Sequence, residues 1–193
     1  MRLLPILALA LLIPPAFGQQ STNSNTNTGG RGAGITAGSF WFYQAFPNVT
    51  LTGGVANTET AMFDVPIPAN AMGPVGILRL TVGWTYNNTA NGKTLRHRFS
   101  NTANSLAGVS ILTFGGANFT VTQGQAIVRN ANATGTQSAL VSGGPNNYFP
   151  TTITIVPMTV DTTQITHLTV TGSIATTTDT ITLTSITVEA LHP

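Results

Sequence analysis

The sequence predicts an all-β fold: an antiparallel two-sheet sandwich of jelly-roll type, with about ten strands and a flexible N-terminal arm. Threonine supplies 34 of the 193 residues, and this β-branched polar side chain suits the exposed face of a sheet. Only 6% of the residues are charged, so the Glu, Lys and Arg that favour helices are scarce. Apolar and polar residues alternate in short runs that Gly, Asn and Pro separate, which is typical of strands and turns.

Composition also excludes several classes of function. The net charge is +2 and no long Lys/Arg run occurs, so the chain is not expected to bind nucleic acid. The absence of cysteine excludes disulfides, thiolate metal sites and cysteine nucleophiles.

Residues 1–18 are predicted to be a cleaved signal peptide. Arg2 precedes eleven apolar residues, 3–13, and small residues at 16 and 18 stand at −3 and −1 before the expected cleavage site. Eleven apolar residues are too few for a membrane span, which needs about 20. We expect a chain that is secreted, periplasmic or on a cell surface, or in a virion if a phage encodes it, with no membrane span after cleavage. An uncleaved apolar arm, or a misassigned start codon, is the alternative.

The mature chain divides into a flexible polar linker, 19–34, and a single domain, 35–193. The linker is Gly-rich and has almost nothing to bury. In the domain, strands are expected at 40–46, 61–67, 77–86, 93–99, 109–114, 118–122, 125–129, 151–160, 164–171 and 180–191.

Two of these strands show their buried faces clearly. In 77–86, every second residue from Leu78 to Tyr86 is apolar, which predicts a half-buried strand with Trp84 in the core. In 180–191, the apolar residues change phase after Leu183, so a bulge near Thr184-Ser185 is expected to restore a single buried face.

No catalytic, cofactor-binding or metal-ligating set emerges from the polar residues. The five carboxylates lie far apart in sequence, and the three histidines show no metal-binding spacing. No G-x-S-x-G nucleophile motif occurs. We therefore expect a non-enzyme without cofactors, in which His97 and His167 serve in packing or hydrogen bonding.

Arg96 and Arg98 are the first candidates for a contact site. Alternation places them on one face of strand 93–99, opposite Leu95, His97 and Phe99. Two adjacent guanidiniums could bind a sulfated, phosphorylated or uronic sugar. The favoured interpretation is that they pair across strands with Asp64 or Glu189, or brace an oligomer contact.

Trp41 and Tyr43 are the second candidates, in the densest aromatic stretch of the chain. They could form a platform on which a sugar stacks. The favoured interpretation is burial in the core or against a neighbouring subunit, because rings lie on both faces of this strand.

Three segments occur in an order typical of one protein family. Phe63-Asp64-Val65-Pro66-Ile67-Pro68-Ala69-Asn70 leads into the strand that contains Trp84, and an Asn-rich turn then precedes Lys93-Thr94-Leu95-Arg96-His97-Arg98-Phe99. Val170-Thr171-Gly172 and a strand over 179–191 follow. Over residues 60–191 this order resembles the small β-sandwich structural proteins of tailed phages and prophages. The resemblance implies a β-sandwich with a role in a particle or appendage, and it brings no catalytic residues.

The expected function is therefore that of a non-enzymatic structural protein of a virion, fibre or surface appendage, working as a homo-oligomer. The alternative is a secreted carbohydrate-binding module that binds a surface glycan through Trp41, Tyr43, Arg96 and Arg98.

Overall fold

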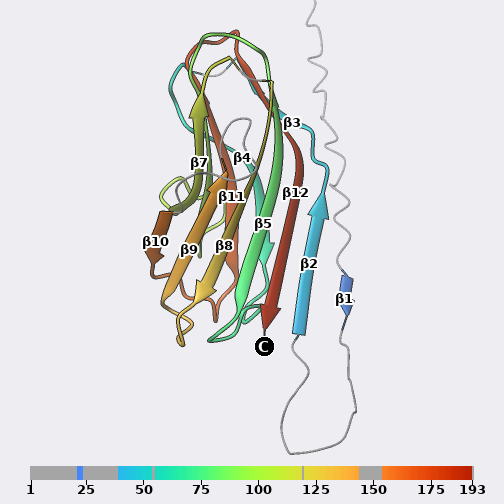
Figure 1. Cartoon of the computed structure of the whole chain (residues 1–193), viewed down its shortest axis with the longest axis vertical. Coiled ribbons are helices and arrows are strands. Elements are labelled where there is room, and N and C mark those ends of the chain that lie inside the picture. The colour runs from blue at the N-terminus through green and yellow to red at the C-terminus, as the bar shows by residue number, and fades with distance from the viewer. Residues whose placement is uncertain (1–20, 24–38, 54, 119, 144–153, 193) are drawn as a thin grey trace, which may run out of the picture.

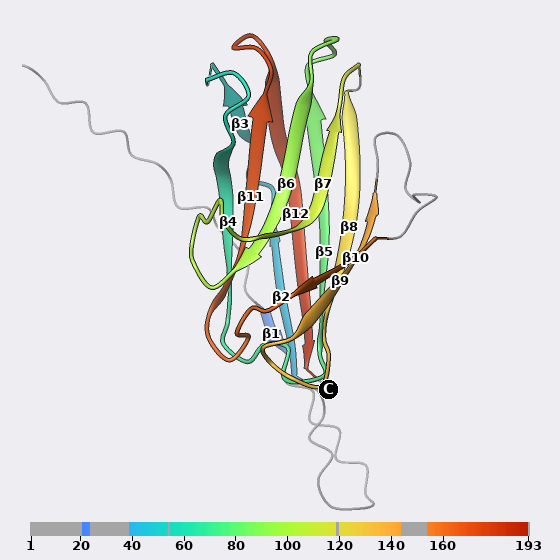
Figure 2. The same ribbon diagram turned by 90° about the vertical axis from the view of Figure 1, so that its left-hand side faces the viewer.

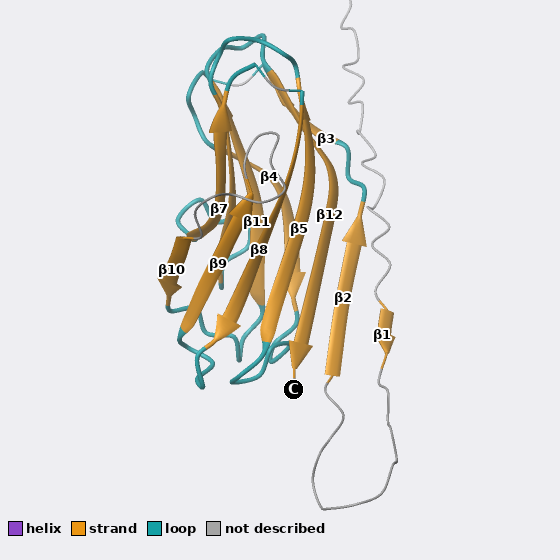
Figure 3. Ribbon diagram, viewed as in Figure 1, coloured by secondary structure: helices purple, strands orange, loops and turns teal. Residues whose placement is uncertain are grey.

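A computed structural model describes residues 21–23, 39–53, 55–118, 120–143 and 154–192, and within these ranges it contains strands and no helix (Figures 1 and 3). The all-β prediction is confirmed, with twelve strands rather than about ten. The strands are β1 (Ser21–Asn23), β2 (Ser39–Ala45), β3 (Val49–Thr52), β4 (Thr60–Ile67), β5 (Ile77–Tyr86), β6 (Lys93–Ser100), β7 (Val109–Gly116), β8 (Val121–Asn130), β9 (Gln137–Gly143), β10 (Thr154–Met158), β11 (Thr166–Ile174) and β12 (Thr180–His192).

The strands form two antiparallel sheets packed as a sandwich of jelly-roll type. Sheet A has the order β1-β2-β12-β5-β8-β9-β10, with β3 also paired to β12, and sheet B has the order β4-β11-β6-β7. Figure 2 shows sheet B lying in front of the central strands of sheet A. Each sheet therefore has one face toward the other sheet and one outer face.

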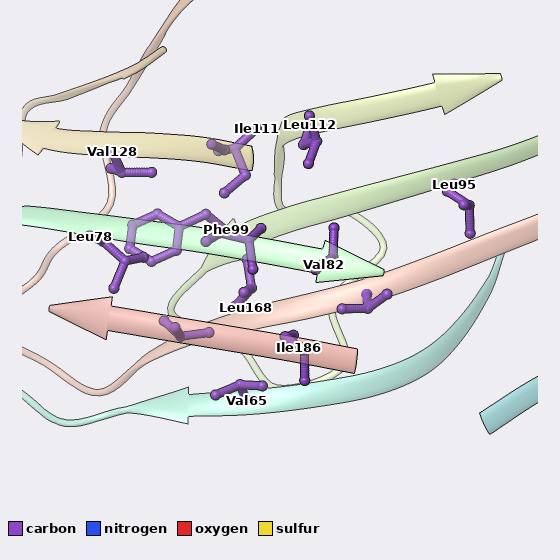
Figure 4. Packing of buried hydrophobic residues seen from close by; sticks show 14 of the residues in the cluster. Val65, Leu78, Val82, Leu95, Phe99, Ile111, Leu112, Val128, Leu168 and Ile186 are labelled. Carbon is purple, nitrogen blue, oxygen red and sulfur yellow. The ribbon is translucent and has the colours of Figure 1, made fainter. Parts of the chain in front are cut away.

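The core lies between the two sheets and follows from the alternation along each strand. In β5 the residues Leu78, Leu80, Val82 and Trp84 are at most 1% exposed, and they alternate with more exposed residues. Side chains from both sheets meet there, as Figure 4 shows for Leu78 and Phe99 among others. Trp84 is fully buried, so the predicted phase of β5 is confirmed.

A bulge in β12 sets the shape of the centre of sheet A. The pairing of β12 with β5 shifts register between Leu183 and Ser185, as the change of apolar phase predicted. Gly83 lies opposite the bulge, where a Cβ atom would come within 2.5 Å of the Ser185 hydroxyl oxygen. The bulge lets Ile181 and Leu183 share the buried face with the apolar residues from Ile186 onward.

The predicted strands 118–122 and 125–129 are a single strand, β8, which corrects the expected division. Gly124, in the gap between the two predicted strands, lies inside β8, and the Phe114 ring occupies the space beside it. A Cβ atom at Gly124 would lie 1.9 Å from the tip of that ring. Strands β3 and β9, both rich in polar or small residues, were not predicted.

The predicted signal peptide, 1–18, lies outside the described residues, as does most of the predicted linker, 19–34. Three residues of that linker, Ser21–Asn23, are described as a short strand paired with β2. In the described part of the chain, no helix long and apolar enough to span a membrane is found.

Candidate functional site

Polar side chains gather on the outer face of sheet B, where β6 displays Arg96 and Arg98. Their neighbours Leu95, His97 and Phe99 are fully buried on the opposite face, as alternation predicted. The Arg96 side chain is 33% exposed and that of Arg98 is 15% exposed, so neither projects freely into solvent.

Both arginines bind the carboxylate of Glu59, which lies just before β4. Arg98 makes a bidentate ion pair with Glu59: Nε donates to Oε1 at 2.7 Å and Nη2 donates to Oε2 at 2.8 Å. Arg96 Nη1 lies 3.2 Å from Oε2, and the hydroxyl of buried Thr171 also donates to Glu59. The arginines pair with a carboxylate of the same molecule, as predicted, but that carboxylate belongs to Glu59 and not to Asp64 or Glu189.

The position of β11 explains this choice of partner. Because β11 lies between β4 and β6, the two arginine side chains must extend across a full strand to reach Glu59. Thr171 of β11 fills the space beneath them. The hydrogen bond from Arg98, with a further bond from Thr171, holds the pKa of Glu59 below its usual value, against the opposing effect of burial. The same bond raises the pKa of Arg98.

A second acidic group on this face, Asp64, orients His167. The distance from His167 Nδ1 to Asp64 Oδ2 is 2.6 Å, and Thr169 Oγ1 donates to Oδ1 at 2.8 Å. The backbone N–H of Asn104 also donates to Oδ1, at 3.0 Å. We call the five residues Glu59, Asp64, Arg96, Arg98 and His167 the outer charge network.

The outer charge network holds the segment 101–108 against sheet B. Asp64 binds the backbone of Asn104, and Arg98 Nη1 donates to the Gly108 carbonyl at 2.8 Å. Figure 2 shows this segment, between β6 and β7, crossing in front of β11. The network therefore anchors the loop between β6 and β7 to sheet B through hydrogen bonds to the loop backbone.

Ser100, His167 and Asp64 are the residue types of a hydrolytic triad, and Ser100 is the cross-strand neighbour of His167. The Ser100 hydroxyl, however, donates to the Thr102 carbonyl at 2.8 Å and accepts from the Thr102 N–H at 3.2 Å. It thus stabilises a turn, and its proton is directed away from the imidazole. No group of three or more metal-ligating side chains is found among the described residues.

Trp41 and Tyr43 lie elsewhere, on β2 of sheet A. Their rings stack with centroids 6.2 Å apart and planes 14° from parallel. Trp41 is 8% exposed and half-buried Tyr43 packs against the core, on the face they share with Val188 and Ala190 of β12. The four candidate residues therefore form no single site: the arginines and the aromatic rings belong to different sheets.

A buried ion pair that the sequence pattern does not predict lies at one end of the sandwich. Lys93 Nζ lies 3.5 Å from Asp179 Oδ1, with side chains 2% and 0% exposed. Burial by itself would raise the pKa of Asp179, but hydrogen bonds from Thr89, Thr176 and Asn91, together with the charge of Lys93, lower it to about 2. Lys93 and Asp179 lie far apart in the sequence, so nothing in their spacing predicts the contact.

His97 takes the packing role expected of it. Its ring makes edge contacts with Trp84, at a centroid distance of 5.7 Å, and with Phe114, at 6.2 Å. Complete burial lowers its pKa to about 3, so the imidazole is neutral at ordinary pH.

No protein-family model matches the chain, and no curated protein matches it in sequence. Among solved structures, the seed lectin of Lotus tetragonolobus is similar at 9% identity and a TM-score of 0.34, over 92% of this chain and 94% of the lectin. A peanut lectin is similar at 13% identity and a TM-score of 0.36, over 92% and 100%. The VP2 subviral particle of infectious bursal disease virus is similar at 9% identity and a TM-score of 0.35, over 81% of this chain and 33% of that chain. At this distance, the likenesses bear on neither ligand nor assembly.

Proposed function

We propose that the protein is a non-enzymatic structural component of a virion, fibre or surface appendage and works as a homo-oligomer. The observation that supports this most is the pairing of Arg96 and Arg98 with Glu59. Glu59 partly neutralises the charge of the two arginines, which were the strongest candidates for an anion-binding face. The arginines instead form ion pairs within the chain.

The other carboxylates support the same proposal. Asp64, Asp161, Asp179 and Glu189 each accept hydrogen bonds or form an ion pair within the chain. A glycosidase or an acid–base catalyst needs carboxyl groups that can face a substrate. Carboxylates that bind groups of the same chain stabilise the fold, as a structural protein requires.

The test compares two variants that should destabilise the fold with a control that should not. Replacing both arginines, Arg96→Gln with Arg98→Gln, leaves Glu59 half-buried without its cations. We expect a loss of about 2 kcal/mol, or roughly 4–8 °C in the melting temperature. Glu59→Gln should also destabilise the fold, because it leaves the arginines unpaired. Arg129→Gln is the control, since this exposed arginine has no ion-pair partner among the described residues.

The alternative function, a carbohydrate-binding module, predicts a different outcome for the same proteins. Glu59→Gln would then free the two guanidiniums and strengthen binding to acidic glycans, and the double arginine variant would abolish that binding without unfolding. Salt-sensitive glycan binding by the wild type, with this pattern among the variants, would overturn the structural proposal.

Export is part of the proposal and rests on the predicted signal peptide. N-terminal sequencing of the protein recovered outside the producing cells should begin near Gln19. A start at Met1 would contradict cleavage.

A further inference from the structure

The outer face of sheet A carries a band of apolar side chains that runs across its strands. Cross-strand pairing places Ile155, Leu140, Ile127, Arg79, Glu189 and Phe42 in one row. The next row along the strands holds the exposed Arg129 beside Ile77 and Leu191, and all nine side chains point away from the core. Ile155 is 66% exposed and Leu191 is 42% exposed. Contiguous apolar surface of this kind is uncommon on soluble monomers and marks a contact surface.

One ion pair interrupts the first of these rows, close to its centre. Arg79 Nη1 lies 3.2 Å from Glu189 Oε2, with side chains 51% and 30% exposed. Beside this pair, a depression of about 100 Å³ is lined by Ile77, Arg79, Glu189 and Leu191. The cation comes from β5 and the anion from β12, which are adjacent strands in the middle of the sheet.

We infer that this face binds the same face of a second copy of the chain, around a two-fold axis that runs between β5 and β12 and parallel to them. The inference rests on the proposed homo-oligomer and names its interface. Such an axis exchanges the two strands, so Arg79 of each copy lies over Glu189 of the other. It also places Leu191 over Ile77, and Phe42 of β2 over Ile127 of β8. Within these pairs, each charge meets its opposite and each apolar residue meets another.

The part of the face that meets its counterpart is large enough for a specific contact. Four strands, β2, β12, β5 and β8, lie symmetrically about the proposed axis; about 4.8 Å apart and with a mean length of roughly 33 Å, they offer about 600 Å² per copy. The total of about 1,200 Å² is at the lower end of the range for specific interfaces. Two sheets packed in this way lie about 10 Å apart with their strands nearly aligned.

The test uses charge reversal on the full chain, with mass measured by analytical ultracentrifugation over a range of concentrations. The wild type should be a dimer with twice the 20.0 kDa mass of the full chain. If the signal peptide is removed, the mass should be twice that of the cleaved chain. Arg79→Glu alone places acidic groups opposite one another, and Glu189→Arg alone does the same with basic groups. Each should raise the dissociation constant at least about 100-fold. Mixing the two variants should restore the dimer, because the two-fold axis then pairs every charge with its opposite.

Ile127→Lys should also separate the copies, whereas Ile165→Lys, at a 54% exposed site outside sheet A, should not. Circular dichroism would confirm that each variant is folded. A wild-type oligomer that none of the sheet A variants disturbs would overturn this interface and leave the proposed structural role intact. A monomeric wild type would overturn both the interface and the homo-oligomer. If residues 1–20 of a monomer cross-link to Ile127, the occupant is the chain's own N-terminal segment and the inference is wrong.

Discussion

Mild acid should destabilise this protein because His97 is buried in its neutral form. The pKa of an imidazole in the unfolded chain is 6.5, and burial lowers that of His97 to about 3 in the fold. Between these values the unfolded state binds a proton that the folded state does not. The contribution of neutral, buried His97 to the free energy of unfolding is therefore present above pH 6.5 and is lost as the pH falls toward 3.

The magnitude follows from the same two values. One pH unit corresponds to 1.36 kcal/mol, so at pH 5 the unfolded state gains about 2 kcal/mol relative to pH 7.5. This figure requires only that the folded-state pKa lie well below 5. Glu59 and Asp179, whose usual pKa values are 4.5 and 3.8, add their own losses only at lower pH.

The assay is the free energy of unfolding by urea at pH 7.5, 6 and 5, for the wild type and for His97→Leu. The variant should lose about 2 kcal/mol less than the wild type between pH 7.5 and pH 5. His167→Asn is the control for the second described histidine, which is bound to Asp64 on the outer face. Equal slopes for the wild type and His97→Leu would refute the reasoning and show that His97 accepts a proton in the folded state.

Three further predictions concern packing and buried charge, all read from urea or thermal unfolding. Trp84→Ala should cost about 3–5 kcal/mol, because the indole is fully buried, and a loss below about 1 kcal/mol would contradict that placement. Gly124→Ala should cost about 1–3 kcal/mol by displacing the Phe114 ring, and Phe114→Leu in the same chain should recover part of it. Asp179→Asn should cost about 3–5 kcal/mol by leaving Lys93 buried without its anion; a near-neutral effect would mean that water reaches this lysine.

The parts of the fold that alternation governs could be predicted from the sequence. Leu78 to Tyr86 gave the bounds and the buried face of β5, and the change of phase after Leu183 located the bulge. Strand β9 was missed because its polar and small residues give a weak apolar pattern. The predicted gap at 123–124 was wrong because Gly124 lies inside β8, where it makes room for the Phe114 ring.

The candidate site was predictable only in part, for a related reason. Alternation correctly placed Arg96 and Arg98 on an outer face, but it says nothing about residues in connections. Glu59 lies outside every strand, and it meets the arginines only because β11 inserts between β4 and β6. The order of strands in a sheet arises from the packing of the whole chain, and no local pattern encodes it.

The central place of β12 in sheet A has a consequence for how the chain folds. β12 pairs with β2, β3 and β5, and it joins Ile181 to Tyr86, about 95 residues earlier in the chain. Until β12 has been synthesised, β2 and β5 have no partner between them, and sheet A cannot close. Contacts so distant in sequence make folding slow, because a large loop must close before they form. If the chain is exported as proposed, slow folding would keep it extended during passage through a translocation channel, and its unpaired strand edges would need protection on the way.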